Sequence, residues 1–208
     1  MNHSLQHLDI LEIDDGGRIC FGADQEWYKR FNRRLSGCGP TNASLIVWYL
    51  SRTRKGASLL VERDASTKEG FFLLMENMWQ YVTPGARGVD STSKLRRGFI
   101  GYCASGGKEV SAYTVDIGSD MRSRPTIEQL SAFLSEHLSK DRPIAFLNLN
   151  NGREKNLDRW HWVTIVSFDN STMTAEIYDQ CKRVSVDIEL WLSTTTLGGG
   201  FLAFEIDG

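Results

Sequence analysis

The sequence has little proline, no closely spaced pair of cysteines and no long apolar run. Among its 208 residues are 4 prolines and 4 cysteines, the latter at positions 20, 38, 103 and 181. Because no C-x-x-C pair occurs, the usual zinc-cluster and thioredoxin-type motifs are excluded. No stretch approaches the roughly 18 apolar residues of a membrane span. The N-terminus lacks a basic segment followed by an apolar one, so no secretory signal is predicted.

Charge of one sign is not in excess either. The chain has 24 basic and 26 acidic residues, a net charge of −2, so no overall attraction to nucleic acid or to an anionic membrane is expected. A chain of this length can bury a full core without covalent staples, and the four cysteines are expected to be reduced thiols. These features predict a cytoplasmic protein, with a secreted effector as the alternative. No cofactor and no metal are predicted, and the oligomeric state is left open.

The pattern of apolar residues changes along the chain from helical to strand-like. After a short strand or hairpin at 10–22, helices are expected over 24–34, 38–54, 67–82, 91–104 and 125–140. Runs rich in β-branched and aromatic residues predict strands over 143–149, 160–168, 173–178, 182–188 and 200–206. Helices followed by strands indicate an α+β fold with an antiparallel sheet. No linker divides the chain, so residues 1–208 are expected to form a single domain, with 56–125 as a helical insertion that is not diagnostic.

The string Gly37-Cys38-Gly39-Pro40-Thr41 carries the most chemical information. Pro40 suits the first turn of a helix, which puts Cys38 at the N-terminus of the helix expected over 38–54. Unpaired backbone N–H groups and the positive end of the helix dipole favour a thiolate at such a position. The flanking glycines, Gly37 and Gly39, leave room for a substrate carbonyl to approach the sulfur. Cys38 is therefore the predicted nucleophile.

A thiolate nucleophile needs a base that later protonates the leaving group, and histidine is the usual choice. His161 opens an apolar run, whereas the other three histidines lie in a polar terminus or on the expected exposed face of a helix. A hairpin through residues 169–171 would bring Asp179 opposite residues 160–162, where its carboxylate could orient the His161 ring. A core histidine and an exposed loop aspartate are the alternatives, and the hairpin geometry favours the triad.

The order Cys38, His161, Asp179 on α+β elements resembles the papain-like cysteine peptidase superfamily, in particular the branch of bacterial peptidases that process double-glycine leader peptides. The resemblance rests on the cysteine motif before a helix, on Trp160-His161-Trp162-Val163 opening a strand, and on Tyr178-Asp179 closing the next. It covers about residues 24–204, of which 56–125 are not diagnostic. It implies a papain-like fold, a thioester acyl-enzyme at Cys38, His161 as base and then acid, and Asp179 as the orienting residue.

The resemblance also implies an amide side chain before the cysteine that donates a hydrogen bond to the oxyanion. Family members commonly use glutamine. Asn32, six residues before Cys38, is the preferred candidate in this chain, with Gln25 as the alternative. The Cys38 backbone N–H would be the second donor.

The predicted substrate-binding residues are Gly37, Gly39 and Trp160. Cys103 and Cys181 are expected to be structural, although Cys181 lies close enough to the predicted triad for a role in the site.

Together these residues predict a cysteine peptidase that acts on a peptide or protein substrate. An acyl- or amidotransferase on the same triad is an alternative, because the chemistry differs only in the acyl acceptor. A second alternative, from another class, is a catalytically inactive papain-like module that binds peptide. Competition between water and an added amine would distinguish the first two, and a thiol without activation would indicate the third. No nucleic acid or membrane partner is predicted.

Overall fold

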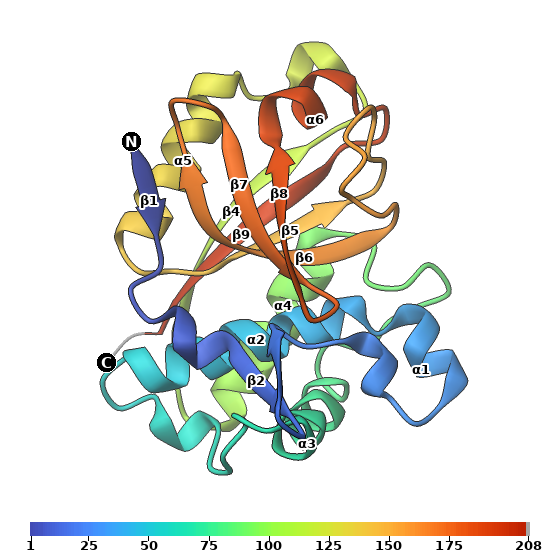
Figure 1. Ribbon diagram of the computed structural model, residues 1–208. Coiled ribbons are helices and arrows are strands. Elements are labelled where there is room, and N and C mark those ends of the chain that lie inside the picture. The colour runs from blue at the N-terminus through green and yellow to red at the C-terminus, as the bar shows by residue number, and fades with distance from the viewer. Residues whose placement is uncertain (207–208) are drawn as a thin grey trace.

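The computed structural model describes residues 1–206 and has a mixed α+β architecture. Helices α1–α4 gather in one half of the molecule, and the main sheet fills the other half together with α5 and α6 (Figure 1). A short helix, η2 (Gln25–Trp27), precedes the first of them. The α-helices in the described part of the chain are α1 (Phe31–Ser36), α2 (Cys38–Thr53), α3 (Lys68–Met78), α4 (Thr92–Ser105), α5 (Ile127–Ser139) and α6 (Ile188–Thr194).

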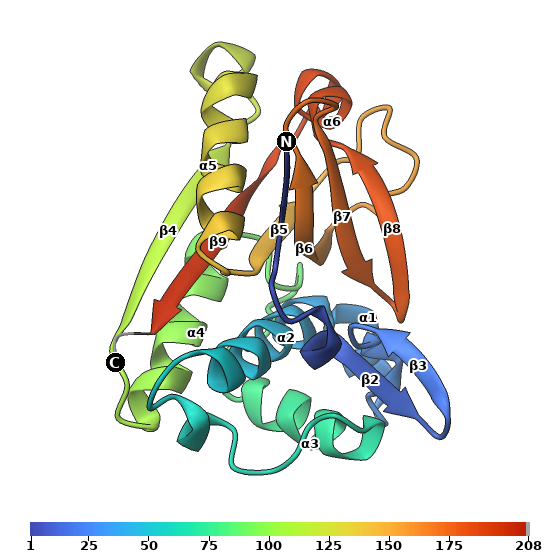
Figure 2. The same ribbon diagram turned by 60° about the vertical axis from the view of Figure 1, so that its left-hand side comes forward.

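The main sheet is antiparallel and follows the order β4-β9-β5-β6-β7-β8, while β1 pairs with the end of β6. The antiparallel sheet predicted for the C-terminal part of the chain is thereby confirmed. A separate hairpin, β2–β3, lies in the helical half (Figure 2). The strands are β1 (Asn2–Ser4), β2 (Glu12–Asp15), β3 (Arg18–Phe21), β4 (Val110–Ile117), β5 (Ile144–Asn148), β6 (His161–Asp169), β7 (Thr174–Asp179), β8 (Lys182–Asp187) and β9 (Gly199–Ile206).

Helix α2 lies between the sheet and α3 (Figure 1). It is buried from Cys38 to Ser51, and its apolar residues surround the helix axis, as expected for a helix enclosed by other elements. It packs against β5 and β6 as well as against α3 and α4. This enclosure fixes the first turn of α2, which begins at Cys38, relative to β6, which begins at His161.

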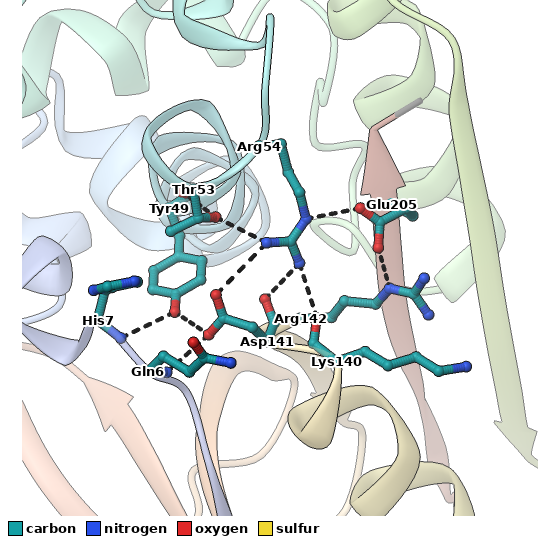
Figure 3. A network of polar contacts seen from close by, with 9 residues as sticks. All are labelled: Gln6, His7, Tyr49, Thr53, Arg54, Lys140, Asp141, Arg142 and Glu205. Carbon is teal, nitrogen blue, oxygen red and sulfur yellow. Dashed lines mark hydrogen bonds and ion pairs between the residues drawn. The ribbon is translucent and has the colours of Figure 1, made fainter. Parts of the chain in front are cut away.

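A polar network closes the far end of α2 against the sheet (Figure 3). The guanidinium of Arg54, the residue after α2, lies 2.7 Å from one Glu205 carboxylate oxygen on β9 and donates to the backbone oxygen of Asp141 over 2.6 Å. The other Glu205 oxygen accepts from Arg142, and the Asp141 carboxylate accepts from the Tyr49 hydroxyl. Two guanidinium groups thus face two carboxylates, which satisfies charges that would be costly to bury alone.

The helix expected over residues 24–34 is wrong in its boundaries. The chain forms η2 at Gln25–Trp27, and α1 begins only at Phe31. Between them Tyr28 has an extended backbone (φ −59°, ψ 131°) and is fully buried, with its hydroxyl donating to the Met75 carbonyl over 3.1 Å. Burying this large ring and satisfying its hydroxyl outweighs the helical pattern of the local sequence.

Three further expectations need correction. Residues 56–125 hold α3 and α4 but also β4, an edge strand of the main sheet, so this segment is not a purely helical insertion. Residues 188–194 form α6, because the Asp187 side chain accepts from the Leu190 N–H and caps a helix where a strand end was expected. His137, expected to face solvent, is buried, and this burial lowers its pKa to about 4.

Cys20 on β3 and Cys181, between β7 and β8, form a disulfide. The prediction that all four thiols are reduced is therefore wrong for this pair, while Cys38 and Cys103 are free thiols. Disulfides persist mainly in oxidising compartments, so the predicted cytoplasmic location loses the support that it drew from reduced thiols. Within residues 1–206, none of the helices combines the length and the apolar character needed to cross a membrane.

Candidate active site

Cys38 is the first residue of α2 and is 9% exposed. Gly37 precedes it and offers no side-chain cap, so the first backbone N–H groups of the helix are not taken by a capping side chain. The Sγ atom of Cys38 lies 4.0 Å from the backbone oxygen of Trp160, the residue directly before β6. The structure therefore brings the predicted nucleophile to the beginning of the strand that carries the predicted base.

His161 and Asp179 form a close pair, with His161 Nε2 2.7 Å from Asp179 Oδ1. Both side chains are largely shielded from solvent, at 8% and 19% exposure. Because Nε2 faces the carboxylate, Nδ1 is the ring nitrogen left for a second partner.

The strand register explains this contact. The β6–β7 ladder ends at the pair Thr164–Tyr178, after a bulge between Ile165 and Ser167. Asp179, the next residue, therefore continues the ladder opposite position 163 rather than opposite the expected 160–162. Position 163 lies on the same face as His161, so the carboxylate reaches the ring as a diagonal neighbour.

The pKa of His161 is raised to about 10 from an ordinary value of 6.5. Burial alone would lower it, because a buried imidazolium loses its hydration. The hydrogen bond with Asp179, the charge of that carboxylate and the nearby Cys38 sulfur outweigh that effect. The site thus stabilises a protonated imidazole between a carboxylate and a sulfur.

Gln25, and not Asn32, lies beside these residues. Gln25 lines a small cavity with Cys38, His161 and Asp179, whereas Asn32 is exposed on α1. The preference for Asn32 as the oxyanion donor is therefore corrected. The break in the helix at Tyr28 is the cause, because it turns the η2 segment back toward the start of α2.

The Gln25 amide is held in place and retains one free donor. Its Nε2 donates to the backbone oxygen of Arg34 over 2.6 Å. An amide nitrogen has two hydrogens, so one remains for a further acceptor at the site. The amide oxygen is buried and has no partner among the described residues.

Two polar residues of the site were not predicted from the sequence. Asn42, one turn after Cys38, donates through Nδ2 to the Thr164 hydroxyl over 2.8 Å, and both side chains are buried. This bond ties α2 to β6 directly behind the nucleophile and the base. The signal in the sequence was an amide side chain four positions after Cys38 on the buried helix, together with a threonine three positions after His161.

A small cavity of about 10 Å³ lies behind the site, at the lower limit of the space that a single water needs. Three buried polar atoms without a partner among the described residues belong to side chains that line it: Gln25 Oε1, Thr41 Oγ1 and Asn42 Oδ1. Two to four polar partners are what a buried water requires. The cavity therefore fits one bound water next to the amide of Gln25.

The glycines beside Cys38 serve packing rather than substrate access. A Cβ on Gly37 would lie 2.6 Å from the Tyr28 ring, and a Cβ on Gly39 would lie 2.6 Å from the Val89 side chain. Both glycines are buried, so their prediction as substrate-binding residues is corrected. Trp160 differs, because its side chain is 47% exposed at the rim of the site, on a residue with a left-handed backbone (φ 56°).

The second free cysteine has a different environment. Cys103 is fully buried on α4, and burial raises the pKa of its thiol to about 12. Burial accounts for this shift. Of the two free thiols, only Cys38 lines a cavity with a histidine that is paired with a carboxylate.

The sequence was compared with protein-family models and with curated proteins, and neither comparison finds a match. Cys38 from the start of α2 and Asp179 from the end of β7 lie on the same small cavity as the imidazole of His161, at the start of β6. The Gln25 amide from η2 lines this cavity too.

Proposed function

We propose that this chain is a cysteine hydrolase of papain-like fold that cleaves a peptide or amide bond through a thioester intermediate. The observation that carries the proposal is the meeting of three side chains: His161 Nε2 lies 2.7 Å from Asp179 Oδ1, and Cys38 lines the same small cavity as both. This arrangement favours a thiolate–imidazolium pair, which is a reactive nucleophile with an acid already in place.

In the first half of the reaction, Cys38 Sγ attacks the substrate carbonyl carbon and forms a C–S bond. The carbonyl oxygen becomes an oxyanion that accepts hydrogen bonds from the Cys38 N–H and from the second Nε2 hydrogen of Gln25. The tetrahedral intermediate then expels the amine, which takes the proton held by His161. The products of this half are a thioester on Cys38, a free amine and a neutral imidazole.

In the second half, the neutral His161 removes a proton from water, which attacks the thioester carbonyl. The C–S bond breaks and releases a carboxylic acid, and the thiolate–imidazolium pair forms again. Asp179 stays ionised throughout and keeps the ring oriented.

We place the entry of substrate on the side of Trp160, because this residue is exposed and its backbone oxygen lies 4.0 Å from Cys38 Sγ.

The test is the alkylation of Cys38 by iodoacetamide as a function of pH, followed by peptide mass mapping in wild type, His161→Ala and Cys103→Ser. We expect Cys38 to react well below pH ~8.5, the ordinary thiol value, and faster than N-acetylcysteine at pH 6. His161→Ala should lose this advantage, whereas Cys103→Ser should keep it.

Incubation with a peptide library, with and without an added amine, then identifies the acyl acceptor by mass spectrometry. Free acid products support the hydrolase, and amide products indicate a transferase. Cys38 that reacts no faster than N-acetylcysteine would overturn the proposal and leave a peptide-binding module.

A further inference from the structure

The disulfide between Cys20 and Cys181 joins two segments that each deliver a side chain to the site. Cys181 lies two residues after Asp179, and Cys20 lies five residues before Gln25. The two cysteines are 161 residues apart in the sequence. Figure 2 shows the turn between β7 and β8 reaching the β2–β3 hairpin of the helical half. The bond therefore links the segment of the orienting carboxylate to that of the oxyanion amide.

The turn that follows Asp179 lies at an edge of the main sheet. Strand β8 is the outer strand of the sheet, and its first two residues are exposed. Gln180 and Cys181 both have left-handed backbones, at φ 48° and 61°, a conformation that costs non-glycine residues free energy. Positive φ at both positions is the backbone of a two-residue hairpin turn between β7 and β8, and here neither position is a glycine.

The contacts around the disulfide support the same alignment. Gly22, two residues after Cys20, packs so closely on β7 that a Cβ would lie 3.1 Å from the Tyr178 Cβ. The rings of Phe21 and Tyr178 meet edge to face at 5.5 Å. Residues 20–22 thus lie against the end of β7, directly before Asp179.

We propose that the Cys20–Cys181 disulfide is a positioning device for the site, so that its reduction disengages Asp179 from His161 and shifts Gln25. This inference rests on the proposed function. It makes the activity dependent on redox conditions in an unusual combination: Cys38 must be a free thiol while Cys20 and Cys181 stay oxidised. Cys38 and the disulfide lie in the same region of the molecule. Whether a redox reagent reacts with the disulfide or with Cys38 is therefore decided by how exposed each sulfur is to solvent.

The reductive step is an ordinary thiol–disulfide exchange with a dithiol. Cys20 is 1% exposed, whereas Cys181 is half-buried, so the thiolate of the dithiol attacks the Cys181 sulfur. Cys20 leaves as a thiolate and takes a proton. The second thiol of the reagent then closes a cyclic disulfide and releases Cys181, so that the protein gains two electrons and two protons in total.

The experiment compares oxidised wild type, wild type reduced with dithiothreitol, and the double variant Cys20→Ser/Cys181→Ser, with Cys103→Ser as the matched control. Mass mapping establishes the state of each cysteine. The readouts are the hydrolysis of p-nitrophenyl acetate and the titration of the His161 ring by NMR. We expect loss of the disulfide to lower the hydrolysis rate about 10–100-fold and to move the His161 titration toward lower pH. Cys103→Ser should change neither.

Reoxidation provides the control for misfolding. Oxidised glutathione should restore both readouts in reduced wild type but not in the double variant. Reduced protein that is folded by circular dichroism and keeps the original rate and His161 titration would overturn the positioning role alone. Oxidised protein without any Cys38 activation would overturn the proposed function, and the inference with it.

Discussion

The protonation of His161 depends on two neighbouring side chains. Its pKa of about 10 lies above the ordinary 6.5, and the carboxylate of Asp179 is one of the groups that raise it. Since the pKa is raised in the folded state, binding of this proton stabilises the fold fully below about pH 6.5. The contribution is lost as the pH rises through about 10.

Replacing Asp179 by Asn should therefore lower the pH at which His161 loses its proton. In the alkylation of Cys38, this loss appears as an upper inflection of the rate against pH. We expect Asp179→Asn to move that inflection down by roughly one to three pH units, the range that a single nearby carboxylate supplies. Asp158→Asn, an exposed carboxylate nearby in the sequence, is the matched control and should leave it in place. An unchanged inflection in Asp179→Asn would contradict the assigned role of this carboxylate.

At the scale of elements, the break between η2 and α1 decides which amide lies at the site. A continuous helix over 24–34 would have changed the direction of the chain before Cys38. The extended backbone at Tyr28 instead brings Gln25 to the cavity and leaves Asn32 on the exposed side of α1.

Experiment can distinguish Gln25 from Asn32 as the oxyanion donor. Ester hydrolysis passes through an oxyanion, whereas alkylation of Cys38 does not. Gln25→Ala should lower the hydrolysis of p-nitrophenyl acetate about 10²–10³-fold, the usual cost of one oxyanion donor. It should leave the rate of Cys38 alkylation unchanged. Asn32→Ala should affect neither measurement. Equal effects of the two substitutions on hydrolysis would contradict the choice of Gln25.

At the scale of the whole molecule, the helical half and the sheet are joined at both ends of α2. The end that begins with Cys38 is tied to β6 by the bond between Asn42 and Thr164, which lies in the site. The far end is tied to β9 by the polar network around Arg54 and Glu205 (Figure 3). A 16-residue helix separates the two ends, about 24 Å at 1.5 Å per residue.

The network at the far end should therefore matter for stability and not for chemistry. Glu205→Gln removes the carboxylate charge that Arg54 and Arg142 share and leaves Arg54 with Asp141, and we expect the free energy of unfolding to fall by about 2–3 kcal/mol. Thermal denaturation should show a Tm lower by roughly 5–10 °C, with Cys38 alkylation unchanged at 25 °C. Glu136→Gln removes an exposed pair with Lys140 and should leave the Tm as it is. A Tm loss of similar size in both variants would contradict the special role of the buried network.

Local sequence determined much of this protein. The period of apolar residues was enough for α2, α4 and α5, and for the strands β5 to β9, because each of these elements buries one face or all faces along its length. The string around Cys38 predicted a cysteine at a helix start, since Pro40 and the helix pattern are local signals. The pairing of His161 with Asp179 followed from a single hairpin, and hairpins connect residues that are close in sequence.

The tertiary structure decided what depends on distant contacts. Burial of Tyr28 against Met75 broke a helix and exchanged Asn32 for Gln25. The bulge in β6 changed the register, so that Asp179 reaches His161 diagonally. Cys20 and Cys181 form a disulfide because two hairpins 161 residues apart meet in space. The free energy of each arrangement lies in contacts between segments far apart in the chain, and no local pattern of residues contains that information.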